Sequence, residues 1–186
     1  MAGERYNSLS SYYKKLFGRR TVRLSIDAGF SCPNRDGTLS CDGCIFCSEQ
    51  GSGDFAGSRL LSVTEQINSQ IELLNNKWPN AGYLAYFQAF TNTYAPIDRL
   101  KAVYCEALNN DMINGIIIAT RPDCITDECI ALLKEMSSKK YVSVELGLQT
   151  SNENTAKLIN RGYNNAVFEN AVNRLKNAVN DITVHI

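Results

Sequence analysis

Residues 22–47 read VRLSIDAGFSCPNRDGTLSCDGCIFC. The first eight of them alternate apolar side chains with polar or small ones, which is the two-residue period of a β-strand. We expect this strand to end at Gly29, and four cysteines follow within sixteen residues: Cys32, Cys41, Cys44 and Cys47. Thiols at these spacings are typical ligands of an iron–sulfur cluster or a zinc ion. The sequence therefore predicts a strand that leads directly into a metal-binding loop.

The rest of the chain alternates strand-like runs with amphipathic helices. Four more strands are expected at residues 82–90, 115–121, 141–150 and 182–186. Between the strands, the apolar period predicts helices at residues 63–78, 96–109, 126–139 and 152–180, the last of them broken at Arg161-Gly162. Regular alternation of strands and helices predicts an α/β fold with a parallel sheet and right-handed crossovers.

The expected strands have one apolar face and one polar or small face. In residues 141–150, for example, aliphatic side chains alternate with Ser143, Glu145 and Gly147. A parallel sheet is normally apolar on both faces, so a repeated polar face indicates a polar cleft, and an open-centred βα barrel fits better than a flat doubly wound sheet. Active sites of such barrels lie at the C-terminal ends of the strands. In this sequence those ends carry Cys32, Gln88, Arg121 and Gln149.

The composition is that of a soluble globular domain, with 44% hydrophobic and 20% charged residues. We divide the chain into an N-terminal basic extension at residues 1–21 and a core at residues 22–186. No stretch is long and apolar enough to cross a bilayer, and the N-terminus lacks the pattern of a signal peptide. Seven cysteines without an export signal indicate a reducing compartment, so we expect a cytoplasmic protein without membrane contact. Nineteen acidic and nineteen basic residues neither favour nor exclude a nucleic-acid partner.

Further motifs make the chain similar to radical SAM proteins of the YhcC-like group. The motifs lie at residues 29–38, 43–47, 83–91, 120–124, 145–150 and 160–162. The resemblance extends from about residue 13 to the last residue, and more distantly the chain resembles the catalytic subunit of Elongator and oxygen-independent coproporphyrinogen oxidase. It implies a radical SAM-type parallel (βα) partial barrel. Because members of the group continue past the fifth strand, we expect this barrel to be incomplete at the C-terminus and the chain to be a fragment of a longer protein.

The resemblance also implies cofactors. Proteins of this kind hold a 4Fe-4S cluster with three thiolates and bind S-adenosylmethionine at the fourth iron. The implied ligands are Cys32, Cys44 and Cys47, and Cys41 departs from the usual pattern of the group. An electron donor such as flavodoxin or ferredoxin would reduce the cluster, and reductive cleavage of S-adenosylmethionine would give a 5′-deoxyadenosyl radical that acts on a substrate the sequence does not identify.

Six side chains are implied contacts of S-adenosylmethionine. Phe46 would lie near the adenine, and the pair Gln149 and Arg161 resembles the pair that binds the methionyl carboxylate in coproporphyrinogen oxidase. The remaining expected contacts at the cofactor site are Gln88, Thr91 and Glu145.

Two alternatives stay open. The cysteine spacing alone also suits a structural zinc site, so the alternative function is a non-catalytic zinc- or cluster-binding module that interacts with RNA. Glu145 and His185, on the polar strand face, either line a substrate cavity or pair with Arg23 or Arg121 as satisfied polar groups.

Overall fold

The computed structural model describes residues 5–186 and contains one five-stranded, all-parallel sheet in the order β1-β2-β3-β4-β5. The strands are β1 (Thr21–Ile26), β2 (Gly82–Phe87), β3 (Ile113–Thr120), β4 (Tyr141–Gly147) and β5 (Asp181–His185). The helices are α1 (Leu9–Phe17), α2 (Val63–Asn75), α3 (Ile97–Leu108), α4 (Asp127–Ser137), α5 (Glu153–Leu158) and α6 (Asn165–Leu175), with a short 3₁₀ helix η1 (Pro122–Cys124). In the described part of the chain β1 and β5 do not pair, so the sheet is open. The predicted α/β class and partial barrel are confirmed.

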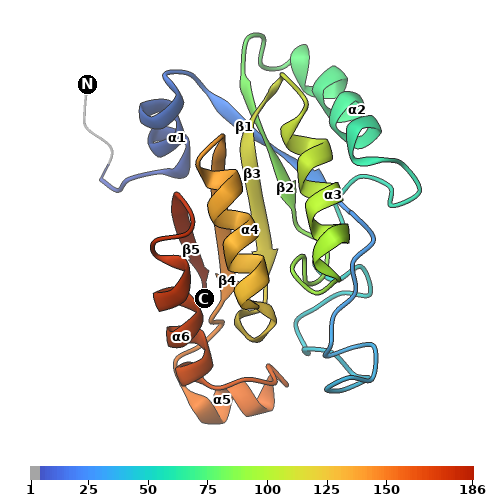
Figure 1. Cartoon of the computed structure of the whole chain (residues 1–186), viewed down its shortest axis with the longest axis vertical. Helices are drawn as coiled ribbons and strands as arrows, with labels where there is room; N and C mark the ends of the chain where they lie inside the picture. The colour runs from blue at the N-terminus through green and yellow to red at the C-terminus, as the bar shows by residue number, and fades with distance from the viewer. Residues whose placement is uncertain (1–4) are drawn as a thin grey trace.

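The two faces of the sheet are covered differently. Figure 1 shows α2, α3, α4 and α6 on one face, and the main apolar core lies between them and the sheet. Its strand residues include Leu24, Ile26, Ala85, Ile116, Val144 and Leu146. On the other face, α1 packs Tyr13 against a smaller cluster with Leu84, Tyr86 and Ile117. Helix α1 lies within the segment expected to be a basic extension, and it leaves the C-terminal ends of the strands on this face uncovered.

Some elements end earlier than the sequence period predicts. Strand β2 ends at Phe87, because the side-chain amide of Asn92 donates to the Phe87 carbonyl at 3.0 Å in place of a further ladder bond. Strand β4 ends at Gly147, two residues before Gln149 takes a left-handed backbone conformation with φ of 63°. The predicted break at Arg161-Gly162 separates α5 from α6, and Gly162 has a φ of +84°.

The outer edge of β1 is paired with side chains instead of a strand. Gln70 accepts from the Ser25 N–H at 2.9 Å and donates to the Ser25 carbonyl at 2.7 Å. One turn earlier on α2, Gln66 makes the same two bonds to Asp27, at 3.0 and 2.9 Å. Unpaired strand edges are sites of unwanted association, and these two amides satisfy the backbone there. Strand β1 ends at Ile26, before the expected end at Gly29.

None of the helices within residues 5–186 combines the length and the apolar character that crossing a bilayer requires.

Candidate functional site

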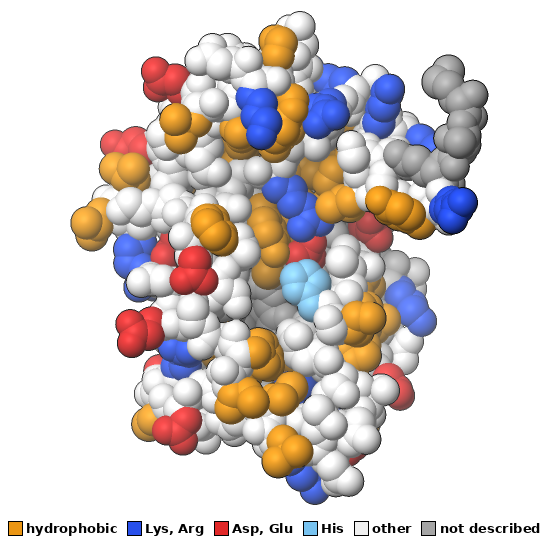
Figure 2. All heavy atoms as spheres, turned by 180° about the vertical axis from the view of Figure 1, so that it is seen from behind, with side chains coloured by type: hydrophobic (Ala, Val, Ile, Leu, Met, Phe, Trp, Pro, Cys, Tyr) orange, Lys and Arg blue, Asp and Glu red, His pale blue; other side chains and the backbone are white. Residues whose placement is uncertain are grey.

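A cavity of about 220 Å³ lies at the C-terminal ends of the strands, on the face away from the four covering helices. Figure 2 views that face, which is hollowed near its centre, with the single histidine of the chain at the rim of the hollow. One side of the cavity, here the cysteine end, is lined by Cys32, Cys44, Cys47, Phe46 and Arg35. The opposite side, here the strand end, is lined by Tyr86, Gln88, Glu145, Gln149 and His185, and Thr91 and Arg121 also face the cavity.

The structure brings eight of the nine expected cofactor-site residues to this one cavity. The three cysteines implied as ligands are all part of its lining, together with Phe46, Gln88, Thr91, Glu145 and Gln149. Arg161 does not line it, and Cys41 is exposed outside it. The roles of these residues remain predictions, but their grouping is a property of the fold.

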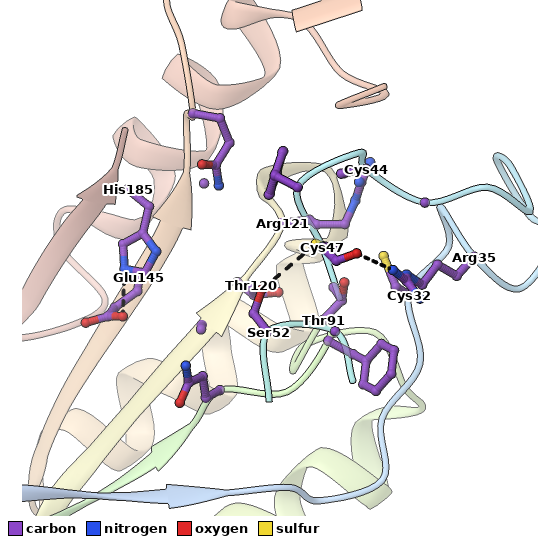
Figure 3. Close-up of a pocket in the computed structure, with 18 of the residues that line it drawn as sticks. Cys32, Arg35, Cys44, Cys47, Ser52, Thr91, Thr120, Arg121, Glu145 and His185 are labelled. Atoms are coloured by element: carbon purple, nitrogen blue, oxygen red, sulfur yellow. Dashed lines mark hydrogen bonds and ion pairs between the residues drawn. The ribbon is translucent and has the colours of Figure 1, made fainter. Parts of the chain in front are cut away.

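The cysteine loop is held by short-range backbone bonds and by Arg35. The Cys32 carbonyl accepts from the N–H groups of Arg35 and Asp36 at 2.9 and 3.1 Å, and the Cys44 carbonyl accepts from the Cys47 N–H at 3.0 Å. The Arg35 guanidinium donates to the carbonyls of Cys47 and Ser48 at 3.0 and 2.7 Å. Figure 3 shows Arg35 and Cys47 joined in this way beside Cys32. These contacts place three thiols on one wall.

The thiols of Cys44 and Cys47 interact directly. A hydrogen bond from Cys44 lowers the pKa of the Cys47 thiol to about 6, with smaller contributions from Ser52 and the charges of Arg35 and Arg121. The same bond, together with burial, raises the pKa of the Cys44 thiol. A thiolate is the form that binds metal, so the pair offers one ready ligand near neutral pH.

The ligand types that the cavity offers bear on which metal group it could hold. Within residues 5–186, no three His, Cys, Asp or Glu side chains converge closely enough to ligate one metal ion. A closed structural zinc site would need a fourth ligand, either a thiolate or a histidine. The cavity supplies three cysteines, and in a cluster each thiolate can bind a different iron. The residues present therefore fit a 4Fe-4S cluster with one open iron.

A second segment braces the cysteine loop from the other side. Asn34, only 1% exposed, donates through Nδ2 to Cys44 Sγ at 3.4 Å and to the Asn160 carbonyl at 2.7 Å. In return, Asn160 Nδ2 donates to the Gly43 carbonyl at 2.7 Å, and the Ile45 N–H donates to the Ile159 carbonyl at 3.2 Å. Sequence reasoning did not single out either asparagine, although both lie within the motifs that carried the resemblance.

Arg161 lies behind the cavity wall. It is 1% exposed and donates through Nη1 to the carbonyls of Leu148 and Thr150, at 2.7 and 2.8 Å. Its other nitrogens donate to the Tyr163 carbonyl at 2.9 Å and to Asn165 Oδ1 at 3.1 Å. In this arrangement its guanidinium is used to hold the loop after β4, and the two carbonyls it binds flank Gln149.

Arg121, unlike Arg161, lines the cavity, as Arg35 does. It holds Asp123 with two bonds, of 2.9 and 2.7 Å, and donates to the Arg161 carbonyl at 3.0 Å. The sequence left Arg23 and Arg121 as alternative partners of Glu145. Arg121 is not that partner, because its guanidinium is paired with Asp123.

Glu145 pairs with Arg23 and His185, and it also lines the cavity. It is 2% exposed, with both partners at 2.8 Å. Burial alone would raise the pKa of Glu145, but the hydrogen bond of His185 and the charge of Arg23 outweigh it, and the pKa is lowered. The bond to Glu145 raises the pKa of His185 against the effect of burial. Figure 3 shows this pair across the cavity from the cysteines.

Comparison with known proteins identifies the family of the chain. The model of the Radical SAM superfamily matches residues 32–186. The uncharacterized protein YtqA of Bacillus subtilis (strain 168) is 44% identical over 173 residues, which are 93% of this chain and 54% of that protein. Protein YhcC of Escherichia coli (strain K12) is 40% identical over 154 residues, 82% of this chain and 48% of that protein. The uncharacterized protein MJ0486 of Methanocaldococcus jannaschii is 33% identical over 156 residues, 82% of this chain and 47% of that protein.

The chain thus spans about half the length of the curated relatives it matches. The family model covers far more than half of the chain and begins at the first cysteine of the cavity. The chain belongs to the Radical SAM superfamily.

Proposed function

We propose that this chain forms the cofactor-binding core of a radical SAM enzyme, with a 4Fe-4S cluster held by Cys32, Cys44 and Cys47 and S-adenosylmethionine bound beside it. The observation that carries the proposal is the sorting of the four clustered cysteines, since three line one cavity and Cys41 lies exposed outside it. When bound, the cluster supplies the electron that cleaves S-adenosylmethionine reductively to a 5′-deoxyadenosyl radical.

The cavity walls offer contacts for each part of S-adenosylmethionine. The Phe46 ring, partly exposed at the cysteine end, would pack on the adenine. Gln149 would bind the amino acid portion, and Arg161 would act through it by fixing the carbonyls of the two neighbouring residues. Gln88 and Thr91 would supply further polar contacts at the ends of the central strands.

We assign the strand end of the cavity to the substrate. Glu145 is held in place by Arg23, and His185 is half-exposed toward the cavity with one ring nitrogen bonded to Glu145. The other ring nitrogen of His185 is left to meet a polar group of the substrate. Reduction of the cluster would require an electron donor of the flavodoxin or ferredoxin type, and the cytoplasm is the compartment that suits a protein with seven free cysteines.

Anaerobic reconstitution with iron and sulfide tests the proposal. The wild type should become brown and hold about four irons per chain, and alanine at Cys32, Cys44 or Cys47 should abolish this loading. Cys41→Ala is the matched control and should load like the wild type, because Cys41 is outside the cavity.

Release of 5′-deoxyadenosine with dithionite as reductant then tests the chemistry. A loaded wild type that binds S-adenosylmethionine but never releases 5′-deoxyadenosine would refute the catalytic proposal. Stoichiometric zinc that depends on Cys41 would support the alternative, a structural zinc module.

A further inference from the structure

The side-chain amide of Asn34 touches a thiol that the proposed function assigns to the cluster. Its Nδ2 lies 3.4 Å from Cys44 Sγ, within range of an N–H···S hydrogen bond. The same nitrogen lies 2.7 Å from the carbonyl oxygen of Asn160. Asn34 is 1% exposed, so water does not compete for either contact.

The orientation of this amide is fixed by the Asn160 contact. If the amide were flipped, its oxygen would face the carbonyl oxygen of Asn160, and two acceptors would meet. The NH₂ group must therefore point toward Asn160. One of its hydrogens satisfies that carbonyl, and the second is available to the sulfur of Cys44.

The surroundings leave Asn34 little freedom to move away from the sulfur. Its own carbonyl accepts from the Gly43 N–H at 2.8 Å, immediately before Cys44. Gly162 packs against it so closely that an added Cβ would lie 3.3 Å from Asn34 Oδ1. A residue with a side chain at position 162 would press on Asn34 and would also be strained, because φ is +84°.

Hydrogen bonds to ligand sulfurs are among the factors that set the reduction potential of an iron–sulfur cluster. A donor stabilises the reduced form more than the oxidised form, because reduction adds negative charge to the iron and its sulfurs. Loss of such a donor therefore lowers the potential and makes the cluster harder to reduce.

We propose that Asn34 is a positioning residue that raises the reduction potential of the cluster through a hydrogen bond to the Cys44 thiolate, an inference that rests on the proposed function. Asn34 touches neither substrate nor S-adenosylmethionine in this role. It acts through Cys44 and is itself aligned by the backbone of Asn160.

A redox titration of the reconstituted protein, followed by the electron paramagnetic resonance signal of the reduced cluster, tests the proposal. In Asn34→Ala the equilibrium constant for one-electron reduction should fall about tenfold, which corresponds to a midpoint potential more negative by about 59 mV. In Asn34→Asp the shift should be larger, because a carboxylate near Cys44 adds negative charge.

Asn160→Gly is the matched control. It removes the side-chain bond to the Gly43 carbonyl, tolerates the φ of 51° at this position, and keeps the carbonyl that aligns Asn34. It should load less iron than the wild type and leave the potential unchanged. If Asn34 were merely structural, its variants would behave as Asn160→Gly does, and that result would overturn the proposal.

Pulsed electron paramagnetic resonance of the wild type, grown with ¹⁵N-labelled asparagine, provides a second measurement that does not depend on the variants. A weak ¹⁵N coupling to the reduced cluster is expected from Asn34, and its absence would also overturn the proposal. A wild type that forms no cluster at all would refute the proposed function and this inference together, whereas a cluster with an unchanged potential in the Asn34 variants would refute the inference alone.

Discussion

At the strand end of the cavity, Glu145 and His185 project from the paired strands β4 and β5, whereas at the cysteine end three thiols come from a loop with no helix or strand of its own. The strand end is positioned by the backbone ladder of the sheet and by the ion pair to Arg23. The cysteine end is positioned by side chains, chiefly Arg35 within the loop and Asn160 from a segment more than a hundred residues later.

The two ends of the cavity should therefore differ in how easily their shape changes. The cysteine loop can adjust its shape more easily than the sheet, because its geometry depends on a few side-chain bonds instead of a continuous ladder. A cavity wall built on paired strands keeps its shape independently of that loop. Substitutions at the strand end should therefore act mainly on stability and protonation, and substitutions at the cysteine end mainly on iron.

Arg161→Ala should have the largest effect, because Arg161 is buried and its guanidinium holds the loop after β4. Its removal leaves the Leu148, Thr150 and Tyr163 carbonyls without their donor and opens a cavity in the fold, so we expect a loss of about 3–5 kcal/mol in the free energy of unfolding. Urea denaturation of the cluster-free protein measures it. Arg174→Ala is the control, since Arg174 is partly exposed, pairs with the exposed Asp127 and donates to a single carbonyl, that of Ile125, so its loss should cost only about 1 kcal/mol. A loss below that level for Arg161 would contradict its structural role.

Glu145→Gln tests the strand end alone. It leaves the Arg23 charge partly buried without its partner, and because Arg23 is 23% exposed we expect a loss of about 1–3 kcal/mol in the free energy of unfolding. The double variant with Arg23→Gln should recover part of this loss, which a double-mutant cycle measures. Iron content should stay at the wild-type level, and a fall in iron binding would show that the two ends are not independent.

The smallest expected effect is on protonation of His185. It is the single histidine of the chain, so one imidazole signal in nuclear magnetic resonance reports its pKa. That pKa should lie above the ordinary value of about 6.5, and Glu145→Gln should lower it, since the bond to Glu145 is the main cause of the increase. Cys41→Ala should leave it unchanged. If Glu145→Gln left the pKa of His185 unchanged, the hydrogen bond to Glu145 would not be the cause of the raised value.

The raised pKa of His185 also determines how its contribution to the free energy of unfolding changes with pH. Because the folded pKa of His185 is raised, its pairing stabilises the fold fully below the unfolded pKa of about 6.5 and is lost as the pH rises through the folded value. The difference in unfolding free energy between wild type and His185→Asn should therefore shrink as the pH increases. A difference that grew with pH would mean that the sign is wrong.

The sheet was predictable from the sequence because a repeated two-residue period determines which side chains share a face. Leu24 and Val144 entered the core and Glu145 the cavity as that period requires. Strand ends were less predictable, since they depend on contacts with distant parts of the chain, such as the bond from the Asn92 amide to the Ala119 carbonyl.

The site was predictable as a set of residues but only partly as a geometry. The resemblance predicted the three cysteines and Gln149, and all four line the cavity. The position of Arg161 behind the wall could not be predicted, because the motif carries the residue type but not the carbonyls that surround it. Asn34 was missed for a related reason, since its partner Asn160 lies 126 residues away in the sequence.

The two glutamines that cover the edge of β1 have a consequence for hydrogen exchange. The amide protons of Ser25 and Asp27 are bonded to side chains of α2, so they are shielded only while that helix is docked. Their exchange with deuterium should therefore report the undocking of α2 separately from the opening of the sheet, whose ladder amides exchange by a different route. The cysteine loop connects β1 to α2. If iron binding to the loop stabilised the docking of α2, the exchange of these two protons would become slower.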